Sequence, residues 1–238
     1  MLHSRTGRPD GRSRLIVPPT KRLTIAIDGP SGAGKGTVSR TLSQSLGYRH
    51  IDTGAMYRAV GWKAILEGIP FEDEARVAAL AERADLVVEG GVVMIDGHDI
   101  TAAIRTPEID AAASAVARLP MVRAVLVARQ RAMGQHGGVV MEGRDIGTVV
   151  FPGADVKIYL DASAEERARR RLYDTAHTAS QSGQAAVAES IAARDKADST
   201  RTASPLTVAP DAIVIDTTTL PIAAVVDRVL AVVREKQP

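Results

Sequence analysis

The strongest chemical signal in the sequence is a glycine-rich segment with a single lysine, made up of Gly29, Pro30, Ser31, Gly32, Ala33, Gly34, Lys35, Gly36 and Thr37. It follows a short β-branched run and opens a predicted helix, which is the context that a phosphate-binding loop requires. The glycines allow backbone amides to surround a polyphosphate, the helix start adds partial positive charge, and Lys35 can reach the β- and γ-oxygens. The segment therefore predicts a nucleoside triphosphate site, and the alternative is a glycine-rich turn without a ligand.

Three further segments combine arginines with acids or hydroxyl groups, at 52–58, 140–148 and 194–201. The first lies where a predicted strand meets a helix, so helix-start amides and Arg58 would meet an anion there. The second follows a buried strand and carries an arginine and an aspartate at the edge where open α/β sheets bind ligands. The structural alternatives are an ordinary helix start with an exposed arginine, a salt-bridged turn and a solvated helix end.

A strongly charged helix is predicted after Ser163, which forms a capping box with Glu166. The helix carries four arginines, Arg167, Arg169, Arg170 and Arg171. Helical pairs such as Glu166–Arg170 would account for one or two arginines on a surface helix, but four outnumber the acids. Beside the polar loop 175–186, these arginines predict a lid over about 164–197 that clamps phosphate and excludes water. We expect the lid arginines to lack partners when no substrate is bound.

An α/β fold must position these residues. The hydrophobic pattern predicts strands at 23–27, near 50–51, at 138–141, 156–160 and 212–215, and helices at 35–46, 55–66, 187–196 and from Pro221. This alternation of strands and helices predicts a parallel sheet covered by helices. Two short runs around Gly90-Gly91 predict an antiparallel hairpin, and hence a small insertion at about 68–112. Helices are also predicted from Pro107 and from Pro120.

The composition limits the possible classes of protein. The chain has 238 residues, 45% of them apolar, which is enough for a sizeable core. It has no cysteine, which excludes disulfides, zinc–thiolate sites and cysteine nucleophiles and fits the cytoplasm. The sequence shows no apolar run of membrane-spanning length and no secretory signal.

The charge of the chain is unevenly distributed. Residues 1–22 carry six lysines and arginines against one aspartate, a net charge of +5, whereas the whole chain carries +2, which leaves −3 for residues 23–238. We therefore expect 1–22 to be a disordered basic tail and 23–238 to be the folded domain. The alternative is a nucleic-acid-binding protein that uses this tail. A switch GTPase is not indicated, because the sequence has no Asn-Lys-x-Asp segment that would read guanine.

The motifs together resemble the bacterial cytidylate kinases, which are P-loop nucleoside monophosphate kinases. The resemblance covers nearly everything from Ile25 to Lys236, and it rests on IDGPSGAGKGT, DTGAMYR, IRTPE, EGRDIGTVVFPGADVKIYLDASAEERARRR and RDKADSTR. Gly36 stands between Lys35 and Thr37, and this variant of the loop resembles that of adenylate-kinase-like enzymes. The basic tail has no counterpart in the family pattern.

The resemblance implies a three-part enzyme with a parallel-sheet core, an antiparallel acceptor-binding insertion and a helical lid. It implies ATP-dependent phosphorylation of CMP and dCMP in pyrimidine nucleotide metabolism. It places seven residues in the acceptor site: Thr53, Arg58, Ser114, Arg123, Asp145, Arg194 and Asp198. Kinases for other small acceptors, such as AMP, UMP or shikimate, are the alternatives of the same class.

The reaction that we expect is in-line transfer to a phosphate oxygen that is already ionised at neutral pH, so it requires no general base. Catalysis then consists of positioning and charge neutralisation. The candidates for neutralising charge are Lys35, Arg144 and the lid arginines Arg167 and Arg170. Thr37 is expected to hold Mg²⁺, in part through water. We expect a monomer that binds only small nucleotides, and neither nucleic acid nor a membrane.

Overall fold

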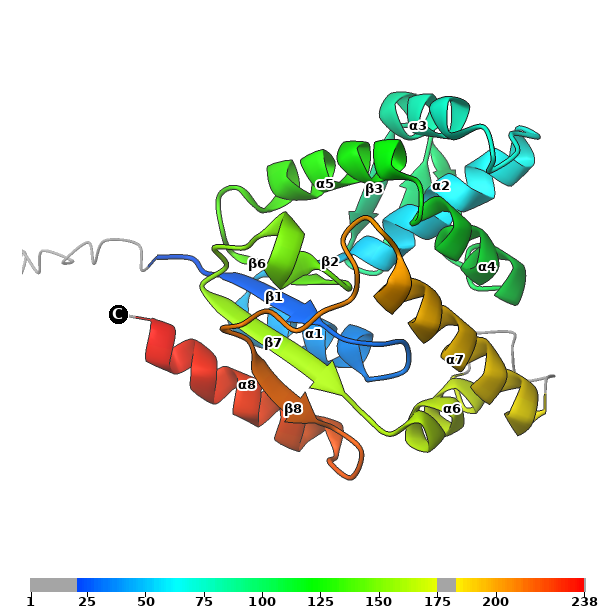
Figure 1. The fold of residues 1–238 in the computed structure, drawn as a ribbon. Coiled ribbons are helices and arrows are strands. Elements are labelled where there is room, and N and C mark those ends of the chain that lie inside the picture. The colour runs from blue at the N-terminus through cyan, green and yellow to red at the C-terminus, as the bar shows by residue number, and fades with distance from the viewer. Residues whose placement is uncertain (1–20, 175–182, 238) are drawn as a thin grey trace, which may run out of the picture.

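The computed structural model describes residues 21–174 and 183–237 (Figure 1). Residues 1–20 of the predicted tail and 175–182 of the predicted lid lie outside the described residues.

Lys21 and Arg22, which the composition assigns to the tail, contact the domain. Lys21 pairs with Asp155, while Arg22 donates to the Gly47 carbonyl at 2.8 Å and lies over the Tyr48 ring. These two residues of the predicted tail therefore contact the folded part of the chain, where their long basic side chains meet an acid, a carbonyl and an aromatic ring.

The main sheet has five strands, β1 (Thr24–Asp28), β2 (Arg49–Asp52), β6 (Val139–Glu142), β7 (Val156–Asp161) and β8 (Ile213–Asp216). Their order is β2-β6-β1-β7-β8, and every pair is parallel. The register places Ile25 of β1 beside Val140 of β6 and Val156 of β7. The predicted parallel sheet is therefore confirmed, and its central strands are the apolar runs that a doubly covered sheet requires.

Eight α-helices are described: α1 (Lys35–Leu46), α2 (Thr53–Leu66), α3 (Glu74–Arg83), α4 (Pro107–Val116), α5 (Pro120–Gly134), α6 (Ala164–Leu172), α7 (Gln184–Thr200) and α8 (Ile222–Lys236). Their ends follow local signals. Gly47 closes α1 with a φ of 63°, and the Thr106 hydroxyl accepts from the Ile109 amide at 3.2 Å before Pro107 opens α4. No single described helix is long and apolar enough to cross a membrane.

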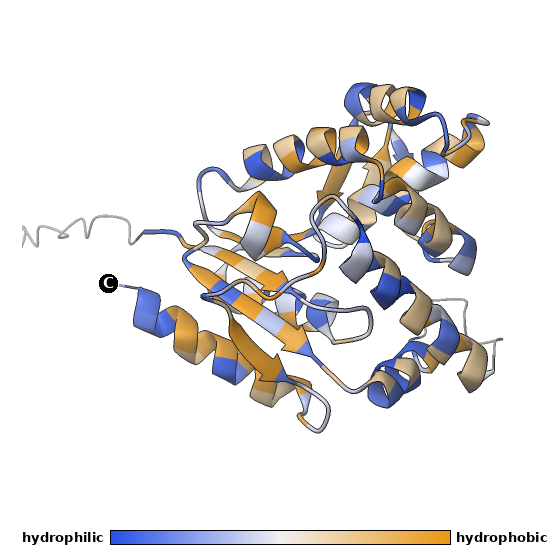
Figure 2. Cartoon of the chain, viewed as in Figure 1, coloured by the Kyte–Doolittle hydropathy of each residue, from blue (hydrophilic) through white to orange (hydrophobic). Residues whose placement is uncertain are grey.

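The two faces of the sheet pack against different helices. Ile25 and Ile27 of β1 share a core with apolar residues of α1 and α8. Ala26, whose side chain points to the opposite face, packs with Val127 of α5 and Ile146. Ile146 opens a short π-helix (Ile146–Val150) that the sequence analysis did not predict. In Figure 2 the strands are mostly orange, as expected of a sheet covered on both faces.

The predicted antiparallel insertion is present as a three-stranded sheet of β3 (Leu86–Glu89), β4 (Val92–Ile95) and β5 (His98–Asp99). Helix α3 beside it was not predicted. The sequence does mark the start of α3 with an N-cap residue, because the Asp73 side chain accepts from the Arg76 amide at 3.2 Å. Its apolar positions, Val77, Leu80 and Ala81, also have helical spacing and are buried.

Helices α6 and α7 form the part of the predicted lid that is described. They pack on each other through a small apolar cluster of Ala168, Leu172, Val187 and Ile191. The Ser163 hydroxyl caps α6 through the Glu166 amide at 3.2 Å, but the Glu166 carboxylate pairs with arginines of its own helix, so only half of the predicted capping box forms. Figure 1 shows the arrowheads of β1 and β7 pointing toward the side of the molecule where α4, α6 and α7 lie.

Candidate active site

A cavity of about 540 Å³ is lined by the glycine-rich loop, the start of α2, the turn after β6, and helices α4, α6 and α7. All seven residues expected in the acceptor site line it: Thr53, Arg58, Ser114, Arg123, Asp145, Arg194 and Asp198. Lys35, Arg144 and Arg170 line the same cavity. The tertiary structure therefore brings together groups that lie up to about 160 residues apart in the sequence.

The glycine-rich loop surrounds the Lys35 ammonium group. Lys35 Nζ donates to the carbonyls of Gly29 at 2.8 Å and Pro30 at 2.7 Å. Gly32 and Gly34 have φ values of 81° and 91°, which only glycine adopts without strain. Gly29 also lacks space, because a Cβ there would lie 2.0 Å from the Leu160 carbonyl oxygen. The loop is thus folded as a phosphate-binding turn requires.

The pKa of Lys35 lies close to neutral pH. Burial, Arg144 and Arg194 together lower its pKa to about 7, although the charges of Glu142 and Asp28 raise it. A polyphosphate in the cavity would favour the charged ammonium group.

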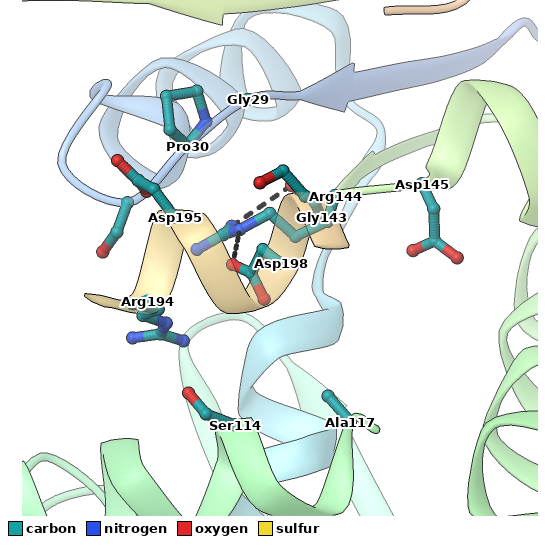
Figure 3. A network of polar contacts seen from close by, with 12 residues as sticks. Gly29, Pro30, Ser114, Ala117, Gly143, Arg144, Asp145, Arg194, Asp195 and Asp198 are labelled. Atoms are coloured by element: carbon teal, nitrogen blue, oxygen red, sulfur yellow. Dashed lines mark hydrogen bonds and ion pairs between the residues drawn. The ribbon is translucent and has the colours of Figure 1, made fainter. Parts of the chain in front are cut away.

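The turn after β6 (residues 143–147, the β6 turn) presents one arginine and one acid. Arg144 Nε donates to the Asp198 carboxylate of α7 at 2.8 Å, as drawn in Figure 3. Burial alone would raise the pKa of Asp198, but Arg144 and Arg194 bring it below the usual value. Figure 3 also shows Ser114 on α4, with the α7 segment that carries Asp198 and Arg194 between it and the glycine-rich loop.

Asp145, the acid of the β6 turn, forms a buried ion pair with Arg123 of α5. Arg123 also donates to the Ala117 carbonyl at 3.4 Å, and its guanidinium lies 5.6 Å from the centre of the Tyr57 ring. Three different elements therefore hold the Arg123 guanidinium in one orientation, which is a condition for reading a planar group in the cavity.

The start of α2 carries the second polar cluster. Asp52 caps the helix through the Ala55 amide at 3.0 Å and pairs with Arg58 at 2.7 Å. Burial raises the pKa of Asp52, but Arg58 and the amide outweigh it and the pKa is low. The Thr53 hydroxyl donates to the Glu142 carbonyl at 2.7 Å, which attaches α2 to the end of β6.

The lid arginines all have acidic or carbonyl partners in this structure. Arg170 pairs with Glu166 at 2.8 Å and reaches Thr217, which precedes α8. Asp110 of α4 accepts from both Arg171 and Arg194. The expectation that these arginines lack partners is wrong, because acids of α4 and of the lid itself lie within reach.

Arg167 lies behind the glycine-rich loop. It donates to the Ser31 carbonyl at 3.2 Å and to the Ala162 carbonyl at 3.0 Å, and it pairs with Asp195. Arg167 is not among the described residues that line the cavity, and neither are Gly29, Pro30 and Ala33 of the loop.

Arg201 lines the cavity although we did not predict it as a candidate site residue. Its side chain is only 5% exposed, and it lies 3.8 Å from both Asp145 and Asp198. Its signal was the alternating charges of 194–201, in which only Arg194 and Asp198 had been singled out. Arg105, Tyr57 and Glu142 also line the cavity without having been predicted to do so.

The oxygen ligands that the cavity offers to a metal ion fit Mg²⁺. The described residues contain no cluster of three acidic or histidine side chains that could hold an ion by themselves. The Thr37 hydroxyl, a hard oxygen ligand, lines the cavity at the start of α1. Such a sparse set fits Mg²⁺, which keeps several waters and is held largely by the phosphates of its substrate.

A sequence model of the cytidylate kinase family matches residues 25–235. The chain belongs to the cytidylate kinase family. A cytidylate kinase from Solibacter usitatus is 47% identical over 218 residues, which are 91% of this chain and 94% of the relative. A cytidylate kinase from Pelotomaculum thermopropionicum is 50% identical over 212 residues, with 87% and 94% of the two chains covered.

Among solved structures, shikimate kinase from Acinetobacter baumannii is similar with a TM-score of 0.50 and 16% identity, over 91% of this chain and 95% of that one. This likeness concerns the fold alone, which is that of the P-loop kinases. Membership of the cytidylate kinase family makes the chain a phosphotransferase with nucleotide substrates and ATP as donor.

Proposed function

We propose that this chain transfers the γ-phosphoryl group of ATP to CMP and dCMP and forms CDP and dCDP. The observation that carries this proposal is that Lys35 and all seven expected acceptor residues line one cavity. Family membership and the 47% and 50% identity to two cytidylate kinases support the same acceptor.

The proposed base site consists of Ser114, Arg123 and Asp145. Cytosine offers an N4 donor and an N3 acceptor, so it requires a protein acceptor opposite N4 and a donor opposite N3. A carboxylate suits N4, as in cytosine recognition generally, and Arg123 can donate to N3. We assign the rest of the acceptor to Thr53, Arg58, Arg194 and Asp198, which line the same cavity.

The proposed reaction is direct in-line transfer between the two nucleotides. The acceptor phosphate is already ionised, so the protein positions it and neutralises the charge on the equatorial oxygens. We assign neutralisation to Lys35, Arg144 and Arg170, which line the cavity. Arg167 would act from behind the glycine-rich loop, by its contact with Ser31. Mg²⁺, held by Thr37 in part through water, would supply further charge neutralisation.

The parts of the molecule then have separate tasks. We propose that the segment at about 68–112 binds the acceptor together with α4, and that about 164–197 is a lid over the phosphates. Because residues of one chain supply the whole candidate site, we propose a monomeric enzyme, acting in the cytoplasm in pyrimidine nucleotide metabolism.

A nucleotide panel with a coupled ADP-release assay tests the proposal. CMP and dCMP should be good acceptors, whereas UMP, AMP and shikimate should be poor. A kcat/KM for AMP, UMP or shikimate that equals that for CMP would reject the assignment of the acceptor.

A further inference from the structure

The β6 turn is attached to the end of β1 at two places. On its near side, the Gly143 amide donates to the Ile27 carbonyl at 3.0 Å. On its far side, the two oxygens of Asp28 accept from the amides of Ile146 at 2.8 Å and Gly147 at 2.7 Å. These contacts join segments that lie 118 and 119 residues apart in the sequence. The two residues between the attachments are Arg144 and Asp145.

The packing around the Asp28 carboxylate leaves the turn little freedom. A Cβ at Gly147 would lie 3.4 Å from Asp28 Oδ2 and 3.2 Å from the Lys157 side chain. A Cβ at Gly143 would lie 2.7 Å from both the Ile146 side chain and the Thr53 hydroxyl. Glycines at both ends therefore allow the backbone to approach the carboxylate and α2 closely.

Burial of the Asp28 carboxylate costs free energy, because the charged group loses its contact with water. Asp28 is only 5% exposed, and its pKa is raised to about 6, because burial and the charge of Asp145 outweigh the amides of Gly147 and Ile146 and the Lys35 charge, which lower it. Tyr159 on β7 also interacts with this carboxylate. An apolar residue here would avoid this cost but would leave two buried amides without acceptors.

We propose that Asp28 is a positioning residue for base selection: by binding both amides at the far end of the β6 turn, it fixes Asp145 in the orientation that distinguishes CMP from UMP. The proposal rests on the proposed function, in which Asp145 accepts from the cytosine amino group. Asp28 itself does not line the cavity among the described residues, so its effect on substrates is exerted through the turn.

The first arm of the test compares Asp28→Asn with a matched control, Asp155→Asn. Asparagine keeps the shape but has one acceptor oxygen, so its amide group would face a backbone donor. Asp155 also accepts from a backbone amide, that of Thr24 at 2.8 Å, but at the opposite end of β1. Both variants should lose stability, whereas only Asp28→Asn should lower the ratio of kcat/KM for CMP to that for UMP, by about tenfold or more.

The second arm uses the wild-type enzyme and covers the case in which Asp28→Asn does not fold. CMP and UMP carry the same 5′-phosphate, so its titration cancels in their kcat/KM ratio. If the ionised carboxylate holds the turn, a pKa of about 6 predicts that the ratio falls about fourfold between pH 7.5 and pH 5.5. A folded Asp28→Asn variant should show a ratio that is flat over this range.

The outcomes separate the two proposals. A wild-type enzyme that shows no preference for CMP rejects the proposed base site, and with it the role of Asp28. A clear preference that stays unchanged in folded Asp28→Asn overturns the role of Asp28 alone. If that variant does not fold, a wild-type ratio that is constant from pH 7.5 to 5.5 overturns it in the same way.

Discussion

Arg123 and Asp145, which lie 22 residues apart in the sequence, form an ion pair at the cavity wall with each side chain less than a tenth exposed. The pair uses one carboxylate oxygen of Asp145, and the other lies 3.8 Å from Arg201. A buried pair of this kind has a fixed donor and acceptor pattern, because neither partner can turn away without losing a buried ion pair.

This pair predicts the selectivity for the base. UMP would set its N3–H against the donors of Arg123 and its O4 against the acceptor Asp145, and such mismatches can support discrimination on the order of 10⁴. CMP and dCMP should therefore be good substrates and UMP a poor one. Asp145→Asn should reduce the CMP/UMP ratio, because an amide can turn its donor toward O4. The measurement is kcat/KM for the three nucleotides, and equal use of CMP and UMP by the wild type would refute the base site.

Lys35→Ala tests the neutralisation of charge at the phosphates. The ammonium group is held inside the glycine-rich loop by the Gly29 and Pro30 carbonyls, so its loss removes a positioned charge from that loop. We expect kcat to fall by about 10²–10³-fold or more while the dissociation constant for CMP stays nearly unchanged. Single-turnover kinetics and CMP titration measure the two effects. Near-normal turnover in a folded variant would show that the transferring group does not depend on Lys35.

Binding of an ATP analogue should also take up a proton. With a pKa of about 7, Lys35 is about 90% uncharged at pH 8 in the free protein. The polyphosphate raises the pKa of Lys35, so a neutral Lys35 takes up a proton when the analogue binds. The uptake should approach about 0.9 proton at pH 8 and vanish below pH 6, where Lys35 is already charged in the free protein. Calorimetry at pH 8 in buffers with different ionisation enthalpies measures it. Lys35→Ala is the control, and an equal uptake by this variant would assign the proton to another group.

The lid should order when both substrates bind. In the described residues, helices α6 and α7 share a four-residue apolar cluster, and ion pairs such as Arg144–Asp198 join the lid to the rest of the chain. Such a unit has low local stability, so its amides should exchange quickly in the free protein. Exchange over about 167–197 should slow when CMP and an ATP analogue are bound together. Equal protection of the lid with and without ligands would argue against closure.

Residues 1–20 should be dispensable for catalysis. The composition of this segment gives it little to bury, and the first contacts of the described chain are those of Lys21 and Arg22. A truncation that begins at Lys21 should keep its kcat/KM within about twofold of the full chain. Removing Lys21 and Arg22 as well should lower the melting temperature. A large loss of kcat/KM in the first truncation would give the tail a role in the reaction.

Local signals in the sequence determined the elements and the phosphate loop. Each of these signals determines the backbone only a few residues to either side, so it can be interpreted without the rest of the chain. Examples are the glycines of the loop, Gly47 after α1 and Thr106-Pro107 before α4. The seven acceptor residues came from the resemblance to a family, and all of them line one cavity. Helix α3 was missed although its cap and spacing were local, so that error was one of interpretation.

Only the tertiary structure decided which charged groups face one another. The order β2-β6-β1-β7-β8 brings the ends of β1 and β6 side by side, and this places Asp28 against the amides of Ile146 and Gly147. The tertiary structure likewise places Arg167 against the Ser31 carbonyl and Arg201 at the wall of the cavity. The sequence shows the charge of each side chain but not its partner, because a partner more than 100 residues away is set by chain crossings and packing rather than by local backbone preferences.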